Sequence, residues 1–161
     1  MITIRRLQSG EADLFRTIRL QALQESPHAF ASTYESALQR TSESWIEQAE
    51  STTQGKDRAT FLVFSNQEPI GIAALYRLEG KSDTGELLQV WISPDHRGSN
   101  AARALLDAIF AWAGENDFHS IQAVVAASNL RALTFYAKYG FLNEMPEITG
   151  QVTLVKEVKK S

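Results

Sequence analysis

Arg97 and the three residues after it, Gly98-Ser99-Asn100, have the types and the position to bind a phosphate. Before them, Val90-Trp91-Ile92 has the β-branched and aromatic composition of a buried strand. After them, apolar residues recur at 101, 104, 105, 108 and 112, the spacing of one helix face. A helix that begins behind a basic turn directs unpaired N–H groups and the positive end of its dipole at an anion, and Arg97 adds a charge that can bind it bidentately. The sequence therefore predicts a diphosphate site at this turn.

Several interpretations of the turn compete. A Walker P-loop needs Lys-Ser or Lys-Thr after its second glycine, and the chain has neither there. A Rossmann fingerprint needs its glycines early in a series of β-α-β units and an acid further on; here the turn lies past the middle of the chain, Asp107 is too close, and Asp117 lacks the motif context. An ordinary strand-to-helix turn without a ligand is the remaining alternative.

A second block, residues 128–141, also combines helix signals with candidate chemistry. Ser128 or Asn129 is a good N-cap, and Gly140 is a good residue to end the helix. An aromatic stripe with helical spacing is more often part of a core than of an active site. The residues that share the predicted face are Ala132, Phe135, Tyr136 and Tyr139.

Both blocks resemble motifs of the GNAT superfamily of N-acetyltransferases. Residues 97–102 resemble its Arg/Gln-x-x-Gly-x-Gly/Ala signature, and residues 129–141 resemble its Asn-x-x-Ala-x-x-Phe-Tyr-x-x-x-Gly-Phe motif. One position departs from the pattern, because Asn100 stands where the family has glycine. If that position needs a positive φ, asparagine is the best substitute, at a cost of about 1 kcal/mol, or roughly fivefold in affinity.

The resemblance implies acetyl-CoA as co-substrate and assigns residues to it. The main chain of the strand is expected to pair with the pantetheine arm, the turn and helix start to hold the pyrophosphate, and the second motif to contact the arm. The implied cofactor-binding residues are Val90, Trp91, Ile92, Arg97, Gly98, Ser99, Asn100, Ala101, Ala102, Arg103, Asn129 and Phe135.

The resemblance also implies two catalytic residues. Tyr136 matches the family's general acid, which would protonate the departing thiolate; the alternative is a core tyrosine with its hydroxyl at the surface. Glu86 is the candidate base, acting directly or through water, although it can equally be an exposed glutamate at a strand end. Simple alternation places Glu86 on one face with Val90 and Ile92, whereas a β-bulge, common in the family, would reset that parity.

Elements that position these residues follow in the order β-α-α-β-β-β-α-β-α-β-β. The expected strands are 3–7, 60–64, 70–76, 86–92, 121–126, 141–145 and 151–158, and the expected helices are 11–26, 30–50, 101–116 and 128–140. Hairpins in the first half and crossover units in the second predict an α/β (α+β) fold. We expect residues 1–161 to form a single GNAT-like domain, with a mixed, mostly antiparallel sheet of about seven strands flanked by about four helices.

Composition limits the function further. The 161 residues are 43% hydrophobic and 22% charged with a net charge of −3, which is typical of a globular domain and lacks the basic cluster of a nucleic-acid binder. No signal peptide or membrane span is recognisable, so the expectation is a cytoplasmic protein. Cysteine is absent, which excludes an acetyl-cysteine intermediate, and three isolated histidines favour no metal site.

The acceptor is the least defined partner. We expect an N-acetyltransferase that moves an acetyl group to an amine of a small molecule or peptide by direct attack in a ternary complex; the alternative is a regulatory module that binds acyl-CoA without transfer. The resemblance also allows a homodimer. Residues that can line the acceptor site are His28, Phe30, Tyr34, Trp45 and Glu144.

Overall fold

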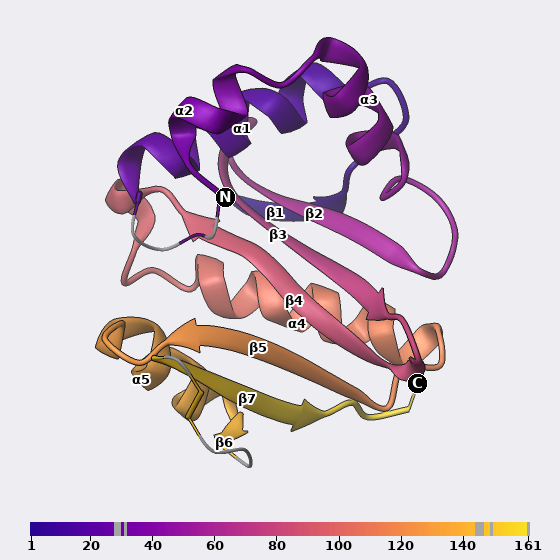
Figure 1. Ribbon diagram of the computed structural model, residues 1–161, viewed down its shortest axis with the longest axis vertical. Helices are drawn as coiled ribbons and strands as arrows, with labels where there is room; N and C mark the ends of the chain where they lie inside the picture. Colours follow the sequence, from indigo (N-terminus) through magenta and orange to yellow (C-terminus); the bar gives the residue numbers. More distant parts are fainter. Residues whose placement is uncertain (28–29, 31, 144–146, 149, 161) are drawn as a thin grey trace.

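A mixed seven-stranded sheet forms the framework of the computed structural model, which describes residues 1–27, 30, 32–143, 147–148 and 150–160 (Figure 1). The strand order is β1-β2-β3-β4-β5-β7-β6. β4 and β5 pair in parallel, and the other pairings between the described strands are antiparallel. The strands are β1 (Ile2–Arg6), β2 (Arg58–Ser65), β3 (Glu68–Leu78), β4 (Lys81–Ile92), β5 (Ser120–Ala126), β6 (Leu142–Asn143) and β7 (Gln151–Glu157).

Five α-helices cover the two faces of this sheet in the described part of the chain. The predicted helix over 30–50 is two helices, because Thr33 and Thr41 each begin a new one: their hydroxyls accept hydrogen bonds from the N–H groups of Ser36 and Ser44. The helices are α1 (Ala12–Glu25), α2 (Tyr34–Leu38), α3 (Ser42–Glu50), α4 (Ala101–Glu115) and α5 (Leu130–Tyr139), with a short 3₁₀ turn at Pro94–His96.

Each face has its own hydrophobic core. On one face, α1–α3 bury Phe15 and Trp45 edge to face, 5.8 Å between ring centroids. On the other, Leu105 and Ile109 of α4 are fully buried against the sheet together with residues of α5. Burying each of these large side chains contributes about 1.5–3 kcal/mol, so the two cores fix both helix layers on the sheet.

The central strand β4 carries a β-bulge. Ile72 pairs with Trp91 but Ala74 pairs with Leu88, so β4 has one extra residue here, and Gln89 has a φ of 61°. Before the bulge Leu87 faces the α4–α5 core; after it Ile92 faces that core and Trp91 faces the opposite one. The expectation from simple alternation is therefore wrong: Glu86 does not share a face with Val90 and Ile92.

β4 and β5 separate beside the bulge. Their parallel pairing ends at Leu87 and Ala123, after which β4 continues to Ile92 without pairing to β5. β5 instead stays paired with β7 along its whole length. The β4 main chain beyond Leu87 thus has no strand paired with it on the β5 side, where β5 has turned to pair only with β7.

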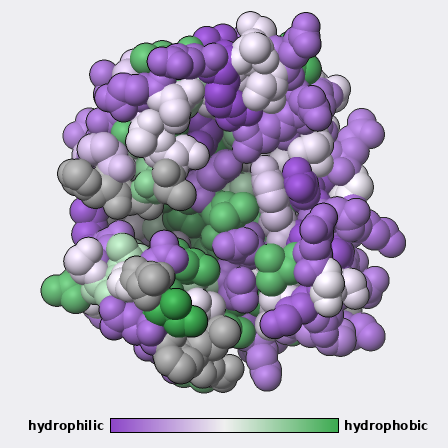
Figure 2. Space-filling view, viewed as in Figure 1, coloured by the Kyte–Doolittle hydropathy of each residue, from purple (hydrophilic) through white to green (hydrophobic). Residues whose placement is uncertain are grey.

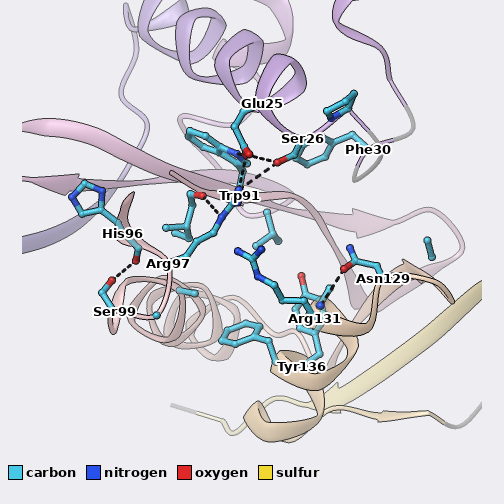
Figure 3. Close-up of a pocket in the computed structure, with 18 of the residues that line it drawn as sticks. Glu25, Ser26, Phe30, Trp91, His96, Arg97, Ser99, Asn129, Arg131 and Tyr136 are labelled. Carbon is cyan, nitrogen blue, oxygen red and sulfur yellow. Dashed lines mark hydrogen bonds and ion pairs between the residues drawn. The ribbon is translucent and has the colours of Figure 1, made fainter. Parts of the chain in front are cut away.

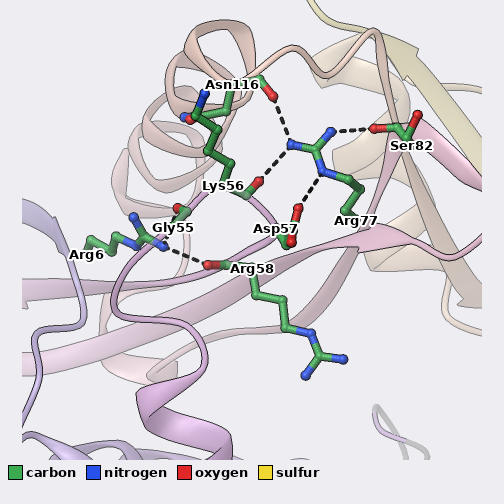
Figure 4. A network of polar contacts seen from close by, with 8 residues as sticks. All are labelled: Arg6, Gly55, Lys56, Asp57, Arg58, Arg77, Ser82 and Asn116. Carbon is green, nitrogen blue, oxygen red and sulfur yellow. Dashed lines mark hydrogen bonds and ion pairs between the residues drawn. The ribbon is translucent and has the colours of Figure 1, made fainter.

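Two arginines, Arg6 and Arg77, bind main-chain carbonyls near the end of the sheet where the β3–β4 turn lies (Figure 4). Arg77 donates to the carbonyls of Lys56, Ser82 and Asn116 and forms an ion pair of 3.1 Å with Asp57. Arg6 donates to the carbonyls of Thr52, Gly55 and Arg58. These charge-assisted bonds to main-chain carbonyls connect the loop between α3 and β2 with β1 and β3.

None of the helices that the structure describes has the length and apolarity needed to span a membrane. Among the described residues, no three His, Asp or Glu side chains are grouped to hold a metal ion.

Candidate active site

A cleft of about 700 Å³ lies where β4 ends, between the last turn of α1, the turn before α4 and the first turns of α5 (Figure 3). In the space-filling view a hollow near the middle of the face has apolar side chains at its floor (Figure 2). Most of the predicted site residues meet here, although they come from distant parts of the chain. Those that line the cleft are Val90, Trp91, Ile92, Arg97, Gly98, Ser99, Ala102, Asn129, Phe135 and Tyr136.

Four predicted residues do not line the cleft. Ala101 is fully buried in the α4–α5 core, and the Arg103 guanidinium lies over the Tyr139 ring at 5.4 Å. Asn100 occupies the N-cap position of α4 and is not part of the cleft lining. Glu86 is half-buried on the α1–α3 face, where it pairs in register with Tyr76.

The turn before α4 presents backbone donors. Gly98 has the left-handed φ of 82°, whereas Asn100 has a φ of −80°. The backbone strain that a positive φ would cause at Asn100 is therefore absent. The position of this turn that does have a positive φ is occupied by a glycine, Gly98. The Asn100 side chain makes no capping hydrogen bond and the first turn holds no acidic residue, so the amides of Ala102 and Arg103 stay open to an anion.

Arg97 is bound to α1 in this structure. Its Nη2 lies 2.6 Å from Oε1 of Glu25 and 3.3 Å from Oγ of Ser26, and its Nε donates to the Ile92 carbonyl at 2.9 Å. Trp91 Nε1 donates to the same Glu25 oxygen at 2.9 Å. A phosphate that takes the Nη2 donor must therefore compete with a carboxylate.

Glu25 is ionised at neutral pH. Desolvation raises the pKa of its carboxyl, but hydrogen bonds from Ser26, Trp91 and Arg97 outweigh it and lower the pKa to about 2. All three donors bind Oε1. The carboxylate thus links the end of α1 to the strand and turn on the other side of the cleft.

Tyr136 is only 7% exposed, yet it lines the cleft. Its ring packs edge to face on Phe141 at 5.2 Å between centroids, and burial raises the pKa of its phenol. Its hydroxyl makes no hydrogen bond to any residue that the structure describes. The phenol is therefore protonated at neutral pH and has a proton to donate.

Asn129 begins the helix that carries Tyr136. Its Oδ1 accepts a hydrogen bond of 3.2 Å from the Ala132 amide, so it is the N-cap, and Gly140 ends α5 with a φ of 117°. The predicted limits of this helix are confirmed. Because Oδ1 is used for capping, the Nδ2 donor is the part of Asn129 available to a ligand in the cleft.

The cleft also contains residues that the sequence did not single out. Glu25 and Ser26 end α1 far from either motif, so no local pattern marks them. Arg131 lies inside the second motif at a position that the motif leaves undefined. Of the predicted acceptor residues, Phe30 lines the cleft, Trp45 and Tyr34 pack in or against the α1–α3 core, and His28 and Glu144 lie outside the described residues.

Comparisons with known proteins agree on the fold. A model of the acetyltransferase (GNAT) family matches residues 20–141. An uncharacterized N-acetyltransferase of Methanocaldococcus jannaschii is 25% identical over 103 residues, which is 61% of this chain but 45% of that protein, so the chain spans less than half the length of this relative.

Solved structures match over the whole chain. A GNAT acetyltransferase from Streptococcus pneumoniae superposes with a TM-score of 0.82 at 18% identity, covering 99% of this chain and 100% of that one. The structure of yncA from Salmonella typhimurium with its cofactor acetyl-CoA superposes with a TM-score of 0.79 at 16% identity, covering 100% and 96%. The family model covers most of the chain, and the chain therefore belongs to the GNAT family of acetyltransferases.

Proposed function

We propose that this protein is an acetyl-CoA-dependent N-acetyltransferase that acts on an amine of a small molecule or peptide by direct attack in a ternary complex. The observation that carries the proposal is the cleft, in which the protonated Tyr136 of α5 and the open first turn of α4 border the same space. Family membership and the acetyl-CoA found with yncA support this choice of carrier.

The diphosphate is assigned to the turn before α4. Gly98, Ser99 and Ala102 line the cleft there, and the amides of the first turn supply donors together with the helix dipole. Arg97 adds a guanidinium once its pair with Glu25 is exchanged for phosphate.

The pantetheine arm is assigned to the open edge of β4. Beyond Leu87 the strand has lost its partner β5, so the main chain of Val90 and the N–H of Ile92 can pair with the amides of the arm as they would with a neighbouring strand. The Ile92 carbonyl already accepts from Arg97 Nε. Asn129 and Phe135 line the opposite wall. This arrangement brings the thioester toward the Tyr136 hydroxyl.

The reaction joins an amine nitrogen to the acetyl carbonyl carbon and breaks the carbon–sulfur bond. A lysine-like amine is mostly protonated at pH 7 and must first lose a proton to a base. Tyr136 donates a hydrogen bond and then a proton to the departing sulfur, a contribution of typically about 10²–10⁴-fold. The products are an amide and the free thiol of CoA.

Glu86 is proposed as the base, acting through water. Its carboxylate does not line the cleft, which argues against direct contact with the amine. It is half-buried one residue before the last β4–β5 pair, Leu87 with Ala123. A module that binds acyl-CoA without transfer is the alternative. The departure from the family motif at Asn100 would favour it if that position were strained, but Asn100 has an ordinary negative φ of −80°.

Acetyl-CoA consumption over a panel of small amines, polyamines and peptides tests the proposal, with calorimetry for cofactor affinity. Tyr136→Phe should lower kcat by at least about tenfold with the acetyl-CoA Kd nearly unchanged. Glu86→Gln should lower kcat with the acetyl-CoA Kd nearly unchanged. Binding without transfer to any amine would establish the alternative, and an unaffected rate in Tyr136→Phe would remove this residue from its role.

A further inference from the structure

Arg19 is a buried cation without a counter-charge among the described residues. It lies on α1, is 6% exposed, and its Nη1 has no hydrogen-bond partner. None of the ion pairs between described residues includes it; its guanidinium lies over the Phe30 ring, 4.8 Å from the centroid. A buried charge of this kind is costly unless something pairs with it.

The surroundings of Arg19 add positive charge instead of neutralising it. Arg40 is near enough for repulsion to help burial lower the pKa of Arg19 to about 10, an effect that Tyr76 partly opposes. Arg40 bonds only to the Oγ and carbonyl of Ser44 among the described residues, and it stacks on Trp45 at 4.0 Å. Two guanidinium groups that repel each other, with no carboxylate paired to either among the described residues, form a site suited to an anion.

This cationic pair lies on the acceptor side of the cleft. Phe30 lines the cleft, and the Arg19 guanidinium, which is not part of the lining, lies over the Phe30 ring. Tyr76, which influences the pKa of Arg19, pairs in register with Glu86, the proposed base. The Arg19 site is thus on the α1–α3 face, away from the turn assigned to the diphosphate.

We infer that Arg19, with Arg40, binds an oxyanion on the acceptor, so that the preferred substrate is an amine that also carries a carboxylate or phosphate group. This inference rests on the proposed function. An oxyanion that reaches Arg19 past Phe30 replaces a cation–π contact with a stronger charge-assisted hydrogen bond and neutralises a buried charge.

Matched acceptor pairs test the inference, because their members differ only in the anion. Glycine and glycinamide test the carboxylate, and phosphoethanolamine and ethanolamine test the phosphate, each with acetyl-CoA consumption as the readout. Arg19→Met removes the charge but keeps an apolar side chain against Phe30. Arg19→Lys keeps the charge but lacks the planar guanidinium that can bind an oxyanion with two hydrogen bonds. Arg16→Met is the matched control, since Arg16 is on the same helix and stacks on Trp45.

The wild type should prefer one anionic member over its neutral analogue. Arg19→Met should lower kcat/KM for that substrate by about 10- to 100-fold, mainly through KM, with the neutral analogue and the acetyl-CoA Kd changed less than about twofold. Arg19→Lys should lie between, and Arg16→Met should resemble the wild type. If Arg19→Met unfolds, Arg19→Lys alone must still show the selective loss.

Two results would overturn the inference. Equal use of the charged and neutral members, or equal losses on both in Arg19→Met, would make Arg19 a structural residue while leaving the proposed transferase intact. Absence of transfer to every amine would overturn the proposed function itself, and the inference with it.

Discussion

Glu25→Gln should tighten acetyl-CoA binding, although it removes a residue of the cleft. The reason is that Arg97 must leave Glu25 in order to bind the diphosphate. In the free protein the Arg97 Nη2 lies 2.6 Å from the Glu25 carboxylate. If Arg97 binds phosphate, this pair must break, and its loss is subtracted from the binding free energy. Glutamine keeps the shape and an oxygen that accepts from Trp91 Nε1, but it removes the charge that holds Arg97.

The size of the expected change in Kd follows from the solvent exposure of the Arg97–Glu25 ion pair. The side chains of Arg97 and Glu25 are 26% and 32% exposed, so solvent screens the pair, and such pairs contribute about 0.2–1 kcal/mol. Removing that competitor should lower Kd by up to about fivefold. Arg97→Ala should raise Kd, since a charged hydrogen bond to phosphate contributes about 1.5–3 kcal/mol, or roughly 10- to 150-fold.

Calorimetric titration of the wild type, both single variants and the double variant forms a complete cycle. In the double variant no guanidinium remains to be released, so its affinity should equal that of Arg97→Ala. Weaker binding in Glu25→Gln would show that Glu25 supports the cofactor site as it stands. An unchanged affinity in Arg97→Ala would refute the phosphate contact altogether.

Three further predictions concern local stability and the turn. Asn129→Ala should lower the free energy of unfolding by about 1 kcal/mol through loss of the α5 cap, whereas Ser128→Ala should change it by less than about 0.5, both measured by urea denaturation. Gly98→Ala and Gly80→Ala impose similar left-handed strain of about 1 kcal/mol, but only Gly98→Ala should also weaken acetyl-CoA binding in calorimetry, because Gly80 lies in the β3–β4 turn. The lowered pKa of Glu25 means that its interactions contribute stability above its ordinary value of 4.5 and are lost as the pH falls through about 2. The deficit of Glu25→Gln, about 1 kcal/mol at pH 6, should therefore shrink on acidification in denaturant titrations; a constant deficit would contradict the assigned pKa.

Local sequence signals predicted the elements whose own side chains fix them. Asn129 and Gly140 mark the ends of α5 because each makes its capping arrangement within one turn. The hairpin between β2 and β3 is similar: Asn66 and Gln67 both have positive φ, which suits a tight two-residue turn. The apolar spacing from Ala101 likewise gave the start of α4.

Features that depend on distant partners could not be predicted. The sequence around Arg97 indicates a cation without a partner. Its partner Glu25 could not be predicted, because it lies at the end of α1 on the opposite side of the cleft. Arg19 fits an exposed position of an amphipathic helix equally well, and only the packing of Phe30 shows that it is buried. The prediction of one helix over 30–50 was wrong because it used apolar spacing alone and did not consider Thr33 and Thr41 as N-caps.

The bulge at Gln89 connects the fold to the proposed chemistry. Without the extra residue, the α4–α5 face of β4 would continue from Leu87 to odd-numbered positions, and Trp91 would replace Ile92 in that core. With it, Trp91 points to α1 and meets Glu25, while Glu86 stays on the α1–α3 face with Tyr76. Gln89 also lies two residues beyond Leu87, the last β4 residue that pairs with β5. One inserted residue thus determines which core Trp91 and Ile92 each join, and it lies beside the point where the β4–β5 pairing ends.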